Sequence, residues 1–172
     1  MITKPNVLIM EDDKGVVKTL KKTYSRYSFT HAENLFDFHG FVFDAPGIEQ
    51  FSLAIMDLQI DMDEFPLSLM KKCFPAMFNE RITRLDNKKA IYGWDYYTRI
   101  IRTDERTAKL ADNKFILLSG HTKLLKDRGY LDEYKNVIIV DKGIDNTQNI
   151  LRDRLSGIIN ETQKSPVTGK PT

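Results

Sequence analysis

Cysteine is almost absent from this chain, which has 172 residues and a single cysteine, Cys73. One cysteine excludes an internal disulfide framework, and we expect it to be a thiol in the hydrophobic core. The sequence also lacks a signal peptide and any apolar run long enough to span a membrane. These absences together predict a protein of the reducing cytoplasm.

An excess of charge of one sign is also absent. The 26 lysines and arginines nearly balance the 24 aspartates and glutamates, which leaves a formal net charge of +2 and predicts no general affinity for nucleic acid or membranes. The three histidines (His31, His39 and His121) do not have the spacing of metal ligands. Apolar residues make up 41% of the chain and charged residues 29%, which is typical of one globular domain.

Four short apolar runs each stop abruptly at polar residues. Such unbroken runs are typical of strands that are buried on both faces. The runs occupy residues 7–10, 53–56, 115–118 and 137–140, and the polar residues that end them include Glu11 and Asp12, Asp57, Ser119, and Lys142.

Helical spacing of apolar residues separates these runs. It predicts helices over residues 14–26, 35–42, 94–101 and 147–158 and a further one from about residue 122, with a short strand over residues 29–32. Asp13 is expected to cap the first helix. Five strands that alternate with helices predict an α/β fold, a doubly wound five-stranded parallel sheet with helices on both faces.

Two segments do not follow this alternation. Residues 161–172 read as a flexible C-terminal tail after a domain of residues 1–160. Residues 61–92 are too long for a simple loop and predict a helical insertion, which Pro75 should divide into two short helices. With six basic and three acidic residues, the stretch 64–92 has a net charge of +3, which favours a solvated helical lid. Its aromatic residues favour the alternatives, a surface that docks a downstream protein or a contact between two copies of the chain.

Polar residues at the carboxyl ends of parallel strands meet at one edge of the sheet, where open α/β sheets bind ligands. Two or three carboxylates that converge there repel one another, and Mg²⁺ is the usual remedy because it prefers oxygen ligands. A lysine opposite the carboxylates can pair with an incoming phosphoryl group, and a serine hydroxyl can add a hydrogen bond. Asp57, which follows a fully apolar run, is then the candidate nucleophile.

These fragments resemble the receiver domains of two-component response regulators, which have the flavodoxin-like fold of the chemotaxis regulator. The resemblance covers roughly residues 5–160 apart from the insertion. It rests on the ordered set VLIMEDD (7–13), LAIMDL (53–58), FILLSGHT (115–122) and VIIVDKG (137–143).

The resemblance implies a role for each matching residue. Glu11 and Asp12 would hold Mg²⁺ together with Asp57 and the backbone carbonyl of Gln59, Asp57 would be the phosphoacceptor, Ser119 the switch hydroxyl and Lys142 its cationic partner. The implied phosphoryl donor is a histidine kinase or a phosphotransfer protein. The domain would catalyse its own phosphorylation and dephosphorylation and signal by conformational switching. Because no DNA-binding helix pair follows residue 160, the output is expected to be a protein contact.

Departures from the family pattern leave two alternatives open. Asp61 and Gly143 stand where the family usually has proline, Ile139 replaces a common aromatic residue, and Gly93 follows Asp57 by 36 residues. These features favour a degenerate receiver that binds a protein independently of phosphorylation. The third class is another Mg²⁺-dependent phosphohydrolase or nuclease that uses Asp57 with nearby aspartates, although the spacing fits neither the haloacid-dehalogenase nor the topoisomerase-primase pattern.

Overall fold

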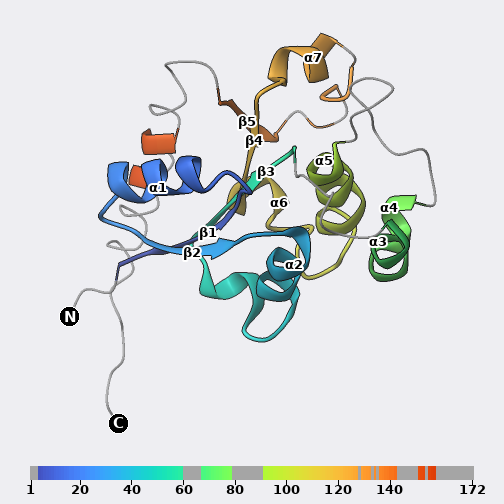
Figure 1. The fold of residues 1–172 in the computed structure, drawn as a ribbon, viewed down its shortest axis with the longest axis horizontal. Helices are drawn as coiled ribbons and strands as arrows, with labels where there is room; N and C mark the ends of the chain where they lie inside the picture. Colours follow the sequence, from blue (N-terminus) through green and yellow to red (C-terminus); the bar gives the residue numbers. More distant parts are fainter. Residues whose placement is uncertain are drawn as a thin grey trace.

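The sheet has the predicted parallel architecture. The computed structural model describes residues 4–59, 67–78, 91–127, 129–132, 134, 136–142, 151–153 and 155–157. Within these residues one five-stranded parallel sheet has the order β2-β1-β3-β4-β5 (Figure 1). The strands are β1 (Asn6–Met10), β2 (Ser28–Ala32), β3 (Leu53–Asp57), β4 (Phe115–Ser119) and β5 (Ile138–Asp141). The second strand begins one residue before the predicted run, and the fifth is shifted by one residue.

The central strand β3 and its neighbour β4 are the most deeply buried strands of the sheet. Every residue of β3 and of β4 is buried, because each strand has a neighbour on both edges and helices on both faces. In the parallel register, Asp57 of β3 lies opposite Leu118 of β4, one residue before Ser119. The register therefore brings the polar ends of the strands to one edge.

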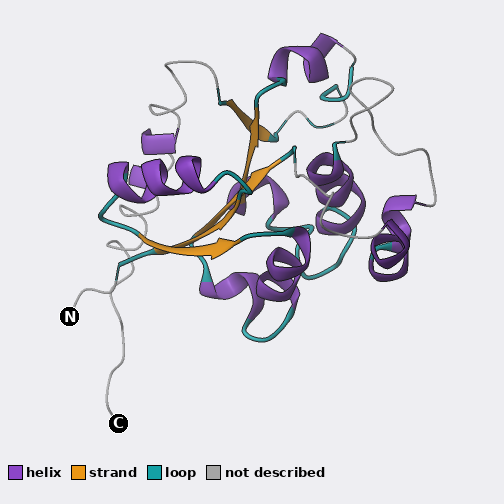
Figure 2. Ribbon diagram, viewed as in Figure 1, coloured by secondary structure: helices purple, strands orange, loops and turns teal. Residues whose placement is uncertain are grey.

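The helices cover both faces of the sheet, as Figure 2 shows. Side chains of α1 pack on one face together with Leu151 and Leu155, while side chains of α2, α5 and η2 pack on the other. The described helical elements are α1 (Lys14–Thr23), α2 (Leu35–Phe43), η1 (Gly47–Gln50), α3 (Leu67–Cys73), α4 (Pro75–Phe78), α5 (Tyr92–Tyr96), the π-helical η2 (Tyr97–Ile101), α6 (Ala111–Lys114) and α7 (Thr122–Asp127).

The helix ends follow the local chemistry of the sequence. Asp13 caps α1 as predicted, because its Oδ1 accepts hydrogen bonds from the backbone N–H groups of Gly15 (2.7 Å) and Val16 (3.3 Å). Helix α1 ends at Thr23, three residues before the predicted limit at Arg26. Soon after α7, Gly129 has a φ of 71°, a left-handed conformation that favours glycine.

The described part of segment 61–92 contains two short helices, α3 and α4, with Phe74 between them and Pro75 at the start of the second. Met70, Phe74 and Met77 are buried, whereas Cys73 is exposed. The prediction of a core thiol was therefore wrong, because Cys73 lies off the helical face that these three residues bury. Residues 61–66 and 79–90 of the segment and the tail 161–172 lie outside the described residues. No helix in the described part of the chain is long and apolar enough to cross a membrane.

Candidate functional site

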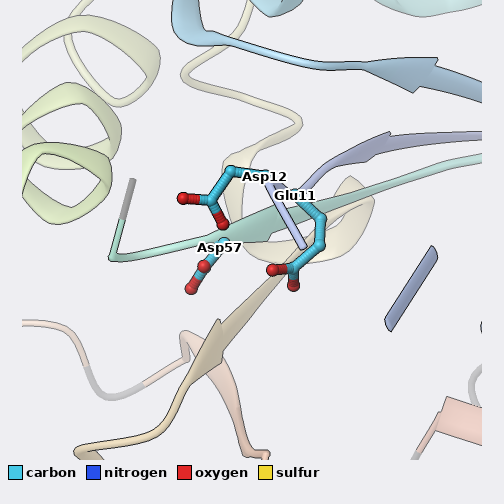
Figure 3. Close-up of side chains that lie close together, drawn as sticks. All are labelled: Glu11, Asp12 and Asp57. Carbon is cyan, nitrogen blue, oxygen red and sulfur yellow. The ribbon is translucent and has the colours of Figure 1, made fainter. Parts of the chain in front are cut away.

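Three of the predicted acidic residues meet at the carboxyl edge of the sheet. Glu11 and Asp12 directly follow β1, and Asp57 is the last residue of the neighbouring strand β3. Figure 3 shows the three side chains lying close together at the ends of these strands, and one carboxylate oxygen of each lies within 4.8 Å of the others. Glu11 and Asp57 are buried, whereas Asp12 is exposed. We call these three residues the acidic cluster.

Lys142, at the end of the edge strand β5, contacts two members of the acidic cluster. It follows β5 directly, and its Nζ donates hydrogen bonds to Asp57 Oδ2 at 2.8 Å and to Glu11 Oε1 at 2.9 Å. The lysine side chain is 26% exposed, whereas the side chains of Glu11 and Asp57 are 0% and 2% exposed. The structure thus brings together, at one point, residues that lie up to 131 positions apart in the sequence.

Only one of the two carboxylate oxygens of Glu11 accepts hydrogen bonds from the described residues. Its Oε1 accepts from Lys142 and, at 3.4 Å, from the backbone N–H of Asp13. Its Oε2 lies 2.8 Å from the same lysine nitrogen as an ion pair, yet among the described residues this buried atom has no partner with hydrogen-bond geometry. A buried carboxylate oxygen in this condition can accept a further cation.

Burial makes ionisation of the two inner carboxylates unfavourable. Desolvation, together with the charge of Asp57, raises the pKa of Glu11 to about 7 despite the opposing effect of Lys142. Burial likewise raises the pKa of Asp57, against the lowering effect of Lys142 and of the Gln59 N–H. Burial works against the charged form of Lys142 too, but the two carboxylates outweigh it and raise the pKa of Lys142.

The other two predicted residues lie beside the cluster. The backbone N–H of Gln59 donates to Asp57 Oδ1 at 3.0 Å and so orients the carboxylate. Ser119, buried at the end of β4, accepts at Oγ a hydrogen bond of 2.9 Å from the backbone N–H of His121. The Ser119 carbonyl also accepts from the Lys142 N–H at 2.9 Å, which joins the ends of β4 and β5. Asp61, Asp63 and Gly143 lie outside the described residues.

Gly93 packs against the backbone of Asp57 and Leu58, a contact that its separation of 36 residues from Asp57 did not predict. Its N–H donates to the Leu58 carbonyl at 3.1 Å, and a Cβ at position 93 would lie only 2.3 Å from the Asp57 carbonyl oxygen. Any side chain there would displace the loop or the start of α5. Only the position of Gly93 where the chain resumes its regular alternation hinted at such a contact.

His31 is a second residue without a predicted role. It lies next to the end of the edge strand β2, and its Nε2 lies 2.7 Å from the backbone carbonyl oxygen of Glu11. Its place near the carboxyl end of a strand, where the polar residues gather, was the available signal. Its spacing to the other histidines, the only feature considered in the sequence, is irrelevant to this contact.

This chain is similar to known proteins in structure and not in sequence. No family model and no curated protein matches the sequence. A response regulator receiver domain protein from Clostridium thermocellum is similar with a TM-score of 0.52 at 13% identity, over 92% of this chain and 97% of that one. A CheY-like receiver domain protein from Methanospirillum hungatei JF-1 has a TM-score of 0.52 at 13% identity, over 95% and 100%. A receiver protein from Pseudomonas putida has a TM-score of 0.51 at 18% identity, over 94% and 99%.

At identities this low, the structural similarity establishes the fold alone. The chemistry has to be argued from the residues of the site. The sheet of this chain is parallel with the order β2-β1-β3-β4-β5, and the similarity to these receiver domains extends over 92–95% of the chain. This chain has the CheY-like, flavodoxin-like fold of the response regulator receiver domains.

Proposed function

We propose that this chain is a phosphoacceptor receiver domain of a two-component system, which takes a phosphoryl group onto Asp57 in the presence of Mg²⁺. The observation that carries the proposal is the acidic cluster with Lys142 bound to both inner carboxylates. The implied donor is a phosphohistidine on a histidine kinase or a phosphotransfer protein, and small acyl phosphates can substitute for it. The boundaries of 1–160 for the domain and 161–172 for a tail are part of the same proposal.

The residues present fit a divalent cation. Three carboxylates and one ammonium group, when all are ionised, leave an excess of two negative charges in a largely buried space. Glu11 Oε2 is a buried oxygen without a hydrogen-bond partner among the described residues, and such hard oxygen donors suit Mg²⁺. Glu11, Asp12 and Asp57 would hold the ion, with the Gln59 carbonyl as a further donor. When bound, Mg²⁺ would offset the carboxylate charge and polarise the phosphoryl oxygens.

The chain's own groups supply the remaining chemistry. A carboxylate oxygen of Asp57 attacks the phosphorus, the phosphorus–nitrogen bond of the phosphohistidine breaks, and the electron pair leaves with the imidazole. The Gln59 N–H holds Asp57 Oδ1 in place during the attack. Lys142, already within 2.8 Å of Asp57, then pairs with the new phosphoryl group.

Ser119 would form a hydrogen bond with the phosphoryl group. Its present bond to His121 uses an acceptor lone pair, so its hydroxyl hydrogen can donate to a phosphoryl oxygen. Ser119 is tied through its carbonyl to Lys142, so both residues respond to the same added charge. Phosphorylation would then shift an existing equilibrium between two conformations, and a partner that prefers one of them would read the signal. Segment 61–92 is the proposed place for such a downstream contact.

A degenerate receiver is the second candidate function. Ile139, half-buried in β5, stands where the family has an aromatic switch residue, which favours a module that binds its partner without phosphorylation. The two candidates differ in one measurable property, because only the first transfers a phosphoryl group to Asp57.

The deciding experiment is the intact mass of the protein after incubation with acetyl phosphate, with and without Mg²⁺. We expect wild-type protein to gain one phosphoryl group only when Mg²⁺ is present, and the Asp57→Asn variant to gain none. The matched control is Asp153→Asn, which neutralises an exposed carboxylate in the C-terminal helical residues and should behave as wild type. Hydroxylamine should release the group, because an acyl phosphate is labile to it. Labelling of Asp57→Asn would contradict the assignment, and no labelling of folded, Mg²⁺-binding wild type would favour the degenerate receiver.

A further inference from the structure

The peptide unit between Glu11 and Asp12 is a part of the acidic cluster that the phosphoacceptor chemistry does not explain. It lies one residue beyond β1, whose pairing with β2 ends at the register pair Met10 and Ala32. A carbonyl past the end of a strand pairing needs another partner. The Glu11 carbonyl finds one in the His31 side chain, whose Nε2 lies 2.7 Å away.

The direction of this hydrogen bond is fixed by chemistry. A backbone carbonyl oxygen can only accept, so the donor is an Nε2–H of His31. The carbonyl and the Asp12 N–H belong to the same planar peptide unit, so holding one end of this plane restricts the rotation of the whole unit. The two side chains that leave this peptide unit, Glu11 on one side and Asp12 on the other, are two of the three members of the acidic cluster.

We propose that His31 is a positioning residue, which fixes the peptide unit between Glu11 and Asp12 so that both carboxylates face Asp57. The inference rests on the proposed function only in taking the acidic cluster as an Mg²⁺ site. His31 is half-buried on an edge strand, so its side chain can reach past the end of the pairing without disturbing the central strands. It acts through the backbone of the ligands and does not touch the ion.

The test is the Mg²⁺ dissociation constant, measured by titration calorimetry, of wild type, His31→Ala and His31→Gln. Loss of a group that orients metal ligands typically weakens binding roughly 10-fold to 100-fold, and we expect this for His31→Ala. Glutamine offers an N–H donor at a similar reach, so His31→Gln should regain most of the affinity. The control Thr30→Val removes another half-buried hydrogen bond of β2, to Asn6 at the amino end of β1, and should bind Mg²⁺ as wild type does.

The outcomes separate the inference from the proposed function. Unchanged Mg²⁺ affinity in His31→Ala would overturn the inference, and so would an equal loss in His31→Ala and His31→Gln, since the donor would then not matter. Free energies of unfolding, measured for all variants, identify any loss that merely follows unfolding. If wild type binds Mg²⁺ but takes no phosphoryl group from acetyl phosphate, the proposed function fails and the same affinities still decide the role of His31. If wild type binds no Mg²⁺, the inference is overturned as well.

Discussion

The acidic cluster and the aromatic layer under α2 both bury polar atoms, but they satisfy them in opposite ways. The aromatic layer comprises Phe36, His39, Phe43, Phe74 and Tyr96, whose rings contact one another with centroids 4.5 to 6.0 Å apart. Its polar groups bond each other, with His39 Nδ1 at 2.8 Å from the Tyr96 hydroxyl. In the acidic cluster like charges face one another, and a single lysine cannot neutralise them.

This difference separates stability from function. We call the aromatic layer closed, because the hydroxyl of the buried Tyr96 has a hydrogen-bond partner within the layer, His39 Nδ1. Among the described residues, the acidic cluster keeps a buried carboxylate oxygen that is ion-paired but has no hydrogen-bond partner, and carboxylates with raised pKa values, which is a cost that a bound cation would reduce. We therefore expect changes in the layer to alter stability and changes in the cluster to alter ligand binding.

The largest expected effect on stability is that of Phe74→Ala. Phe74 is 2% exposed and contacts Phe36, His39 and Tyr96, so its removal should lower the free energy of unfolding by about 3–5 kcal/mol. Leu69→Ala, on the helix α3 that directly precedes Phe74, is the matched control, because Leu69 is 40% exposed and its loss should change stability by less than about 0.5 kcal/mol. Urea unfolding measures both.

The folded fraction of Phe74→Ala should still gain a phosphoryl group from acetyl phosphate as wild type does. Two results would contradict the assignment of stability to the layer and of ligand binding to the cluster. One is loss of phosphorylation in fully folded Phe74→Ala, and the other is equal destabilisation by Phe74→Ala and Leu69→Ala.

The next effect is stabilisation by Mg²⁺. An ion that binds the folded state alone adds about 2.7 kcal/mol at a concentration of 100 times its dissociation constant, and we expect this increase in wild type. Asp12→Asn and Glu11→Gln each remove one carboxylate and should gain distinctly less at the same concentration. Urea unfolding with and without Mg²⁺ measures the increments. Na⁺ at matched ionic strength controls for general screening, and an increment that survives both substitutions would place the ion elsewhere.

The residues of the acidic cluster were predictable because strand ends are visible in a sequence. Where an apolar run stops at Asp57 or at Ser119, the parallel register fixes which residues face each other, and the resemblance then supplied roles. The contacts of His31 and Gly93 were not predictable, because neither hydrophobic period nor spacing reports where a side chain reaches or how closely two backbones approach. Cys73 was misplaced because the prediction followed the general tendency of a free cysteine to be buried, whereas Cys73 lies off the face that Met70, Phe74 and Met77 bury.

The smallest expected effect is a pH dependence that arises in the aromatic layer. Burial lowers the pKa of His39 below its usual 6.5, an effect that the nearby Asp44 and Asp104 oppose and Arg106 reinforces. Well above pH 6.5 the imidazole is neutral in both the folded and unfolded states, and His39 then adds no pH dependence to stability. Below it the unfolded state binds a proton more readily, so the free energy of unfolding should fall as pH decreases from about 6.5.

His39→Gln should remove this fall, and the difference between wild type and variant at each pH is the informative quantity. Glu11, whose pKa is raised to about 7, contributes with the opposite sign, because a buried acid destabilises the folded state when ionised and this cost disappears as pH falls. Subtracting the variant cancels Glu11, since the substitution lies in the layer and not in the cluster. A difference that stays constant between pH 8 and pH 5 would show that His39 is not a titrating member of the layer. A difference that shrinks as pH falls would support the contrast between a closed layer and an open cluster.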